Sequence, residues 1–338
     1  MTRVRFGFIG CSSIARRRMA PVVCASDFAT LEHIGSRDVA KAGEFAREFN
    51  CAKWGTYEAV LADPEVDAVY ISTPPALHAP WVRAAAAHGK HILCEKPAFT
   101  DQRIAAEMIA LCRRHNVRLM EGYMFGYHPQ HAVVRSLLTS GRIGELRVVQ
   151  GEFTFPQPAA GSFRLARELG GGVFSDAAGY PVAADMLLFQ AAPLSIFCQL
   201  ELDATNGVDN LAALTLAFPG GGTAQLLAGY GLHYRSRYAA LGTMGRIEVT
   251  RAFSVLPEMK VEVLVETAAG SETIAVPPAD QFQLMLKDFC GQLKKPATGR
   301  PSFKETFEEK LLCQHTVMAA AWRSHLEKRP VCLSEFAP

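Results

Sequence analysis

A lysine and a tyrosine that lie far apart in the chain are the residues whose types suggest the most specific chemistry. Lys96 stands in the tripeptide Glu95-Lys96-Pro97, and Tyr180 follows Asp176 by one helical turn, after the run Gly170-Gly171-Gly172. Transfer of hydride to a carbonyl carbon creates an oxyanion, which a fixed ammonium stabilises while a phenol supplies the neutralising proton. The two side chains therefore favour reduction of a carbonyl group by a bound hydride donor.

Neither residue is diagnostic by itself. A lone lysine is most often a solvated surface residue, and a lone tyrosine at a helix start is most often a half-buried aromatic. The motifs around Lys96 and Tyr180 favour the catalytic interpretation. Because the two residues are distant in sequence, separate structural units must bring them to one cleft.

The segment Gly10-Cys11-Ser12-Ser13-Ile14-Ala15 has the position and part of the pattern of a dinucleotide-binding loop. It follows an apolar run at residues 4–9, and a helix is expected from Ile14 onward. A helix N-terminus attracts phosphate because its N–H groups converge and its dipole is positive there. Ser12 and Ala15 replace the second and third glycines of the usual pattern, but Ala15 permits close packing and the Ser12 hydroxyl can donate to a pyrophosphate. A plain tight turn is the alternative.

The tip of the second predicted strand bears on cofactor choice. An acidic residue at this position selects the ribose hydroxyl of NAD, whereas a hydroxyl with an arginine suits the additional phosphate of NADP. Here Ser36 and Arg37 occupy the tip, and Asp38 falls one or two places late. We therefore predict NADP(H), with an ordinary solvated arginine as the alternative.

Strands and helices alternate through the first 120 residues. The expected strands are 4–9, 31–35, 66–71, 91–94 and 117–120, and the expected helices begin at Ile14 and span 39–49, 80–88 and 101–115. Pro21 is expected to cut or kink the first helix. This alternation predicts right-handed crossovers and a parallel sheet.

The pattern changes after about residue 121. Runs with a period of two residues occur at 146–153, 211–218, 224–230 and 260–265, and the glycine-rich segment 219–222 is a hairpin candidate. These runs predict a large, mostly antiparallel open sheet with one face covered by helices. Two late helices, 281–294 and 303–327, are expected to pack back on the first domain. We expect a dinucleotide-binding domain at 1–121 and an α+β substrate-binding and oligomerisation domain at 122–338.

Bulk composition excludes several classes of protein. With 338 residues the chain is long enough for two domains, and 49% hydrophobic with 20% charged residues is an ordinary globular balance. A formal charge of +2, from 35 basic and 33 acidic residues, gives no support for nucleic-acid binding. The nine cysteines are scattered with no Cys-x-x-Cys pair, and neither a signal core nor a membrane-spanning run is seen. We expect a cytoplasmic protein.

Several separated motifs together resemble the Gfo/Idh/MocA oxidoreductase family. They are the glycine loop, Ser-Thr-Pro-Pro-x-x-His at 72–78, the run 89–97 that ends in Glu-Lys-Pro, and the three glycines before Asp176. Segments 120–125 and 128–131 look most like the NADPH-dependent ketoreductases of nucleotide-linked 3-keto-6-deoxyhexoses. Many members carry His where this chain has Tyr180. The resemblance implies a Rossmann domain followed by an α+β domain whose free sheet face forms a homodimer or homotetramer.

The resemblance also implies roles for individual residues. Lys96 and Tyr180 are the expected catalytic residues, one bonding the reacting oxygen and one donating the proton, and Asp176 is a catalytic or orienting contact. The expected cofactor contacts are Gly10, Cys11, Ser12, Ile14, Ala15, Ser36, Arg37, Thr73, Pro74, His78, Glu95 and Lys96. The expected substrate contacts are Lys96, Tyr123, His128, Arg164, Asp176 and Tyr180. Glu95 and Pro97 set the turn that aims Lys96, and the Lys-Pro bond is often cis in this family.

Other interpretations of the same residues stay open. The His88/His91 and His128/His131 pairs lack a third ligand at metal spacing, so no metal is predicted. His128 contacts substrate or is structural, and Arg164 pairs with a substrate diphosphate or lies on the surface. The expected substrate is a sugar, possibly nucleotide-linked. A dehydrogenase of free aldoses or dihydrodiols, an NAD-recycling glycosidase and a non-catalytic NADP sensor are the competing functions.

Overall fold

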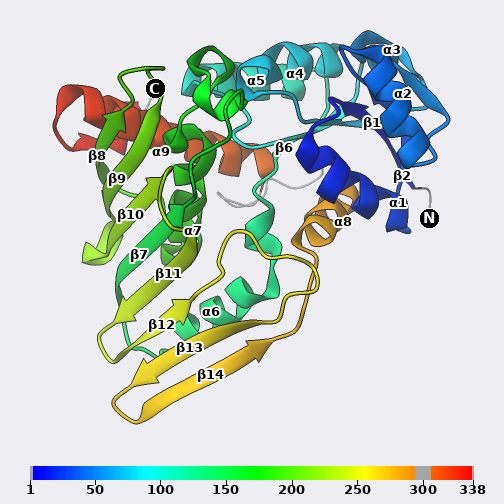
Figure 1. Cartoon of the computed structure of the whole chain (residues 1–338). Helices are drawn as coiled ribbons and strands as arrows, with labels where there is room; N and C mark the ends of the chain where they lie inside the picture. Colours follow the sequence, from blue (N-terminus) through cyan, green and yellow to red (C-terminus); the bar gives the residue numbers. More distant parts are fainter. Residues whose placement is uncertain (1–2, 294–305, 337–338) are drawn as a thin grey trace. The chain divides into compact units, whose positions relative to one another are not determined.

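The computed structural model describes residues 3–293 and 306–336, which form two compact units (Figure 1). Unit 1 comprises Met1–Tyr123 and Phe282–Leu312, and unit 2 comprises Met124–Gln281 and Cys313–Pro338. The long helix α9 (Phe307–Glu327) begins in unit 1 and ends in unit 2. Each unit is built on one sheet.

The sheet of unit 1 has six strands, all paired in parallel, in the order β3-β2-β1-β4-β5-β6. The strands are β1 (Val4–Ile9), β2 (Ala29–Gly35), β3 (Lys53–Gly55), β4 (Ala68–Ile71), β5 (His91–Cys94) and β6 (Leu119–Glu121). The strand order reverses beside β1, and loops that follow β1, β2, β4 and β5 carry the predicted cofactor residues. Ligands of such sheets bind outside the carboxyl ends of the strands at this reversal.

Six α-helices of the described residues lie in unit 1, apart from the first residue of α8, Gln281, which is assigned to unit 2. They are α1 (Ala20–Ala25), α2 (Val39–Glu48), α3 (Tyr57–Ala62), α4 (His78–Ala87), α5 (Gln102–Arg114) and α8 (Gln281–Leu293). Before α1 the chain forms a π-helical segment at Ala15–Met19, and Pro21 lies in the first turn of α1. Proline has no N–H to donate, so the regular bond pattern cannot run through it. The chain stays helical from residue 13 to Ala25, so Pro21 does not cut the helix, and the change from π-helical to α-helical geometry falls between Met19 and Ala20.

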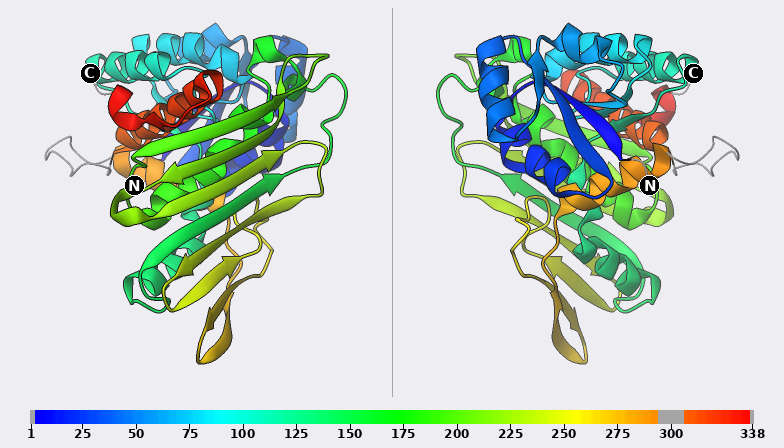
Figure 2. Two further views of the ribbon diagram at one scale, coloured as in Figure 1. Left: turned by 90° about the vertical axis from the view of Figure 1, so that its left-hand side faces the viewer. Right: turned by 90° about the vertical axis from the view of Figure 1, so that its right-hand side faces the viewer.

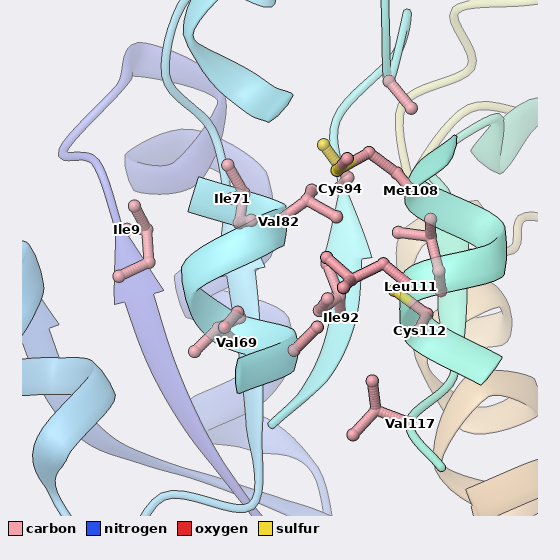
Figure 3. Packing of buried hydrophobic residues seen from close by; sticks show 14 of the residues in the cluster. Ile9, Val69, Ile71, Val82, Ile92, Cys94, Met108, Leu111, Cys112 and Val117 are labelled. Atoms are coloured by element: carbon pink, nitrogen blue, oxygen red, sulfur yellow. The ribbon is translucent and has the colours of Figure 1, made fainter. Parts of the chain in front are cut away.

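The core of unit 1 lies between β1, β4 and β5 on one side and α4 and α5 on the other (Figure 3). Ile9, Val69, Ile71 and Ile92 are fully buried strand residues in this cluster. They pack against Val82, Met108, Leu111 and Cys112 from the two helices. Strands buried on both faces read as continuous apolar runs, which is why β1, β4 and β5 were found from the sequence.

The sheet of unit 2 has nine strands in the order β14-β13-β12-β11-β7-β10-β9-β8-β15, shown side by side in Figure 2. They are β7 (Leu146–Thr154), β8 (Ser195–Leu202), β9 (Asp209–Ala217), β10 (Thr223–Gly229), β11 (Arg235–Gly242), β12 (Gly245–Val249), β13 (Val261–Thr267), β14 (Gly270–Val276) and β15 (Val331–Cys332). Only β7 and β10 pair in parallel. The predicted mostly antiparallel sheet is confirmed, including the β9–β10 hairpin.

Helices of unit 2 lie against one face of this sheet. Helix α7 (Gly179–Phe189) packs on β7 and β10, and α6 (Pro129–Thr139) packs on β13. A π-helical segment, Phe174–Ala178, leads directly into α7. Side chains of the opposite face, among them Phe197 and Gln225, are exposed.

Most predicted elements exist, with shifted ends. The helix expected at 80–88 begins at His78, and the strand expected at 117–120 is Leu119–Glu121. Strands β3, β8, β11, β12, β14 and β15 and helices α3 and α6 were not predicted. Lys294 and residues 303–305, which fell inside two predicted helices, lie outside the described residues. Within the described ranges, no helix has both the length and the apolar character required to cross a bilayer.

Candidate active site

Gly10 is required by the geometry of the glycine loop. Its φ is +111°, and a Cβ at this position would lie 3.2 Å from Ser72 Oγ and 3.3 Å from Thr73 N. The Ser72 hydroxyl donates to Gly10 O at 3.1 Å, and Gly10 N donates to Gly35 O at 3.0 Å. The loop after β1 is thus fixed to the ends of β2 and β4. Only glycine combines this φ with so close a neighbour.

Ser12 closes the start of the first helix. Its hydroxyl oxygen accepts from Ala15 N at 3.1 Å, which satisfies one of the N–H groups that a helix start leaves unpaired. A hydroxyl keeps one proton to donate while it accepts, so the predicted bond to a pyrophosphate remains compatible with this cap. Ala15 is fully buried and Cys11 is nearly so, as close packing of the helix on the sheet requires.

The tip of β2 presents an arginine, while the nearby carboxylate is already used. Asp38 is the N-cap of α2, and its Oδ1 accepts from Ala40 N at 3.0 Å and Lys41 N at 3.3 Å. Ser36 is buried, with its hydroxyl accepting from Asp38 N at 3.2 Å, and Arg37 is exposed. Burial raises the pKa of the Cys11 thiol, and the nearby charge of Lys41 partly offsets this effect. Sequence reasoning did not single out Lys41.

The turn that carries Lys96 is held by buried carboxylates. Tyr70 OH donates to Glu95 Oε1 at 2.6 Å, and burial raises the Glu95 pKa. On the other side of Lys96, Ala98 N donates to Glu121 Oε1 at 2.8 Å. The Lys96-Pro97 bond is cis. Both neighbours of the Lys96-Pro97 dipeptide are therefore fixed by buried acceptors, and Tyr70 and Glu121 were not identified from the sequence.

His78 links this turn to the loop after β4. The ring is 1% exposed, with Nε2 2.7 Å from Thr73 O and Nδ1 3.1 Å from Pro97 O. Burial lowers the His78 pKa, and the hydrogen bonds to the Thr73 and Pro97 carbonyl oxygens partly offset this effect. Pro74 accepts from Leu77 N at 2.9 Å in the same loop. The described structure gives the buried Thr73 Oγ1 no hydrogen-bond partner, so this oxygen is available to a ligand.

In unit 2, Tyr180 stands in an aromatic cage formed by Phe125, Phe153 and Phe253. The ring centroids lie 5.7, 5.0 and 5.9 Å from that of Tyr180, respectively. Its hydroxyl points to Met124 Sδ at 3.7 Å, a weak acceptor. Tyr180 is 5% exposed. The three rings surround the Tyr180 phenol and fix its direction.

Asp176 lies in the π-helical segment that precedes Tyr180. Its Oδ2 accepts from Arg164 Nε at 2.7 Å and from Tyr230 OH at 3.0 Å. Burial lowers the Arg164 pKa, but attraction to Asp176 outweighs it and the pKa is raised. The structure thus brings the predicted residues Asp176 and Arg164 together. Tyr230 was missed, and no local signal pointed to it.

The helix that carries Asp176 and Tyr180 is capped from another strand. Asp209 of β9 is 5% exposed and its Oδ2 accepts from Phe174 N at 2.5 Å. Burial raises the pKa of Asp209 to about 6, against the lowering effect of the backbone N–H groups. Gly172 has a φ of +108°, and a Cβ there would overlap the Asp209 carboxylate. The three-glycine run therefore allows the cap to approach.

The remaining predicted substrate residues have structural contacts in their own units. His128 is the N-cap of α6, with Nδ1 accepting from Gln130 N at 3.3 Å, and is 1% exposed. Tyr123 follows β6 and its N–H donates to Glu121 O at 3.0 Å. Among the residues that the structure describes, no three His, Cys, Asp or Glu side chains gather as a metal site would require.

Comparison with known proteins supports an oxidoreductase. Residues 4–123 match the "Oxidoreductase family, NAD-binding Rossmann fold", and residues 131–248 match the "GFO/IDH/MocA C-terminal domain". The chain is 37% identical to dTDP-3,4-didehydro-2,6-dideoxy-alpha-D-glucose 3-reductase of Saccharopolyspora spinosa, over 86% of this chain and 88% of that protein. It is 32% identical to D-xylose 1-dehydrogenase (NADP(+)) 2 of Haloferax volcanii, over 89% and 92%.

A solved structure agrees in fold over almost the full length. KijD10, a 3-ketoreductase from Actinomadura kijaniata in complex with NADP and TDP-benzene, has a TM-score of 0.90 and 31% identity, covering 96% of this chain and 98% of that one. The fold and the matches define a two-domain oxidoreductase with a Rossmann domain. The chain belongs to the Gfo/Idh/MocA oxidoreductase family, and the predicted family is confirmed.

Proposed function

We propose that this protein is an NADP(H)-dependent reductase of a keto sugar, with a nucleotide-linked 3-keto-hexose as substrate. The observation that carries the proposal is the caged phenol of Tyr180, one turn from the carboxylate of Asp176, in a chain related to 3-reductases over 86% of its length. The likeness to a 3-ketoreductase that binds NADP and TDP-benzene supports the nucleotide-linked substrate.

The residues of unit 1 fit NADP(H). Gly10 and the capped helix start leave the backbone close to where a pyrophosphate binds, and the unpaired Thr73 hydroxyl is available in the adjoining loop. The Asp38 carboxylate is occupied as the cap of α2, which leaves the exposed Arg37 to meet a ribose phosphate. When bound, the reduced cofactor supplies the hydride.

The proposed chemistry divides between three side chains. Lys96 stabilises the oxyanion that develops at the sugar carbonyl, and Tyr180 donates the proton to the same oxygen. Asp176 accepts from a sugar hydroxyl and orients the ring. The apolar cage keeps water from Tyr180 and fixes the phenol, so that the proton is delivered in one direction.

The test measures NADPH oxidation with 3-keto-sugar nucleotides. Tyr180→Phe is expected to lower kcat about 10²–10⁴-fold, the usual contribution of general acid catalysis. Lys96→Ala is expected to lower kcat about 10²–10³-fold. NADPH affinity, measured by fluorescence, should stay unchanged in Tyr180→Phe. Tyr238→Phe is the matched control because Tyr238 is a buried phenol of the same unit that bonds His131 at 3.0 Å. Full activity in the Tyr180→Phe, Lys96→Ala double variant would refute the assigned roles.

A second candidate is an NADP-dependent dehydrogenase of free aldoses, favoured by the 32% identity to a D-xylose dehydrogenase. Here Tyr180 would accept rather than donate the proton. A panel of free sugars with NADP⁺, run beside keto-sugar nucleotides with NADPH, separates the two functions by kcat/KM.

We also propose that the protein is a homo-oligomer that associates through the exposed sheet face of unit 2. We call this surface the open face and define it by Gln150, Phe197, Thr215, Gln225 and Leu227. It contains a shallow hollow of about 440 Å³. Phe197 is 39% exposed there, which leaves a large apolar side chain in water unless a second copy covers it.

A further inference from the structure

Tyr230 stands directly after β10 and directs its hydroxyl at Asp176. The OH lies 3.0 Å from Asp176 Oδ2 and 3.4 Å from Gly172 O, so both acceptors belong to the segment that leads into Tyr180. The residue is 5% exposed, and its backbone N–H donates to Asn210 O at 2.8 Å. Its position is therefore fixed by the sheet.

Arg164 and Tyr230 both donate to Asp176 Oδ2, but their side chains differ in rigidity. The Arg164 side chain is 43% exposed and belongs to a short 3₁₀ turn, Phe163–Leu165. A long exposed arginine exchanges partners easily, whereas a buried tyrosine has two torsion angles and little freedom. If an anionic group of the substrate draws Arg164 away, Tyr230 still holds the carboxylate.

We propose that Tyr230 is a positioning residue that orients the Asp176 carboxylate for the sugar hydroxyl it receives. This inference rests on the proposed function of Asp176. Burial and the charge of Asp176 raise the Tyr230 pKa, so the phenol keeps the proton that it donates to the carboxylate. Arg164 from the loop and Asp209 from β9 are charged or titratable groups that act on Tyr230, and Tyr180 from α7 acts on Arg164.

The test compares Tyr230→Phe, Asp176→Asn and their double variant, using the sugar that the wild type reduces best. Tyr230→Phe is expected to lower kcat/KM about 10-fold, mainly through a higher KM for the sugar, with the KM for NADPH unchanged. In the Asp176→Asn background the same change should cost less than about 2-fold, since Tyr230 acts through the carboxylate.

The pH dependence of kcat/KM distinguishes the loss of the Tyr230 hydrogen bond from a loss of packing, because a loss of packing alone would not shift it. A hydrogen bond to the charged form lowers a carboxyl pKa, so removing the Tyr230 hydroxyl raises the Asp176 pKa. The acid limb of kcat/KM should therefore move to higher pH in Tyr230→Phe and stay in place in the control Tyr238→Phe. An unmoved limb, or an equal loss in both Asp176 backgrounds, overturns the inference.

Failure of the proposed function is recognised separately. If the wild type reduces no sugar of the panel, the proposed function is rejected. The coupling between Tyr230 and Asp176 is then measured by urea unfolding of the wild type, the two single variants and the double variant. A coupling of about 10-fold in the unfolding equilibrium constant supports the placement of Tyr230 on the carboxylate. Additive effects on unfolding overturn it.

Discussion

At the residue scale, the aspartates of this protein have different roles because their hydrogen-bond partners differ. Asp38 caps α2, Asp176 bonds an arginine and a tyrosine, and Asp209 caps a helix from a distant strand. The Asp185 carboxyl is buried on α7 without a hydrogen-bond partner in the described structure. Only the surroundings distinguish the carboxyl that serves the proposed site from the others.

Arg37→Ala is expected to weaken NADPH binding about 10–100-fold and to leave NADH binding nearly unchanged. The loss corresponds to about 1.5–3 kcal/mol for hydrogen bonds to a charged group. Fluorescence titration with both cofactors measures the two dissociation constants. Equal loss for both would show that Arg37 does not meet the ribose phosphate.

Asp185→Asn is expected to raise stability more at pH 8 than at pH 5. Burial raises the Asp185 pKa well above its usual value, so the folded protein holds a proton that the unfolded chain releases. This contribution is fully present below the unfolded pKa and is lost as pH rises through the folded pKa. Asparagine does not titrate there. Urea unfolding at the two pH values measures the difference, and a pH-independent difference would contradict it.

At the scale of elements, both glycine motifs lead into π-helical segments. Ala15–Met19 follows the loop of Gly10, and Phe174–Ala178 follows the three-glycine run. A π-turn changes the rotation between successive side chains and often occurs at functional sites. In unit 2 this segment places Asp176 beside Arg164 and Tyr230 while Tyr180 faces the aromatic cage.

The Asp209 cap is expected to stabilise the helix that carries the site. Asp209→Ala should lower the free energy of unfolding by about 1–2 kcal/mol, the usual cost of a lost cap, and Asp209→Asn should cost less. The folded-state pKa of about 6 lies above the usual 3.8, so wild-type stability should fall as pH rises across this interval. Thermal unfolding of the wild type and Asp209→Asn between these pH values tests this. A wild-type slope that survives in Asp209→Asn would assign the effect to another group.

At the scale of the whole molecule, the predicted site residues are divided between the two units. Unit 1 holds the predicted cofactor residues and Lys96, and unit 2 holds Tyr180, Asp176 and Tyr230. The proposed reaction therefore needs both units. The sheet of unit 2 supports the helix with Tyr180 on one face and presents the open face on the other.

Phe197→Glu combined with Leu227→Glu is expected to convert the proposed oligomer to monomers. A carboxylate buried at an interface without a partner is strongly unfavourable. Light scattering after gel filtration measures the mass. Leu256→Glu, at a residue 48% exposed outside the open face, is the control and should keep the wild-type mass. An unchanged mass in the double variant would place the interface elsewhere.

The sequence by itself determined the parallel sheet, the mostly antiparallel second sheet and the positions of Gly10, Lys96 and Tyr180 along the chain. Apolar periodicity and glycine turns are local signals, because the burial of neighbouring positions produces them. Short or partly exposed strands such as β3 and β14 have weak periodicity, and they were missed.

The tertiary structure alone decided which groups bond one another. Tyr230 reaches Asp176 across 54 positions of sequence, Asp209 reaches Phe174 across 35, and Tyr70 reaches Glu95 across 25. A hydrogen bond between distant residues requires that separate strands and helices place the two atoms within about 3 Å. That placement follows from the packing of the sheets and helices, and it leaves no local pattern in the sequence.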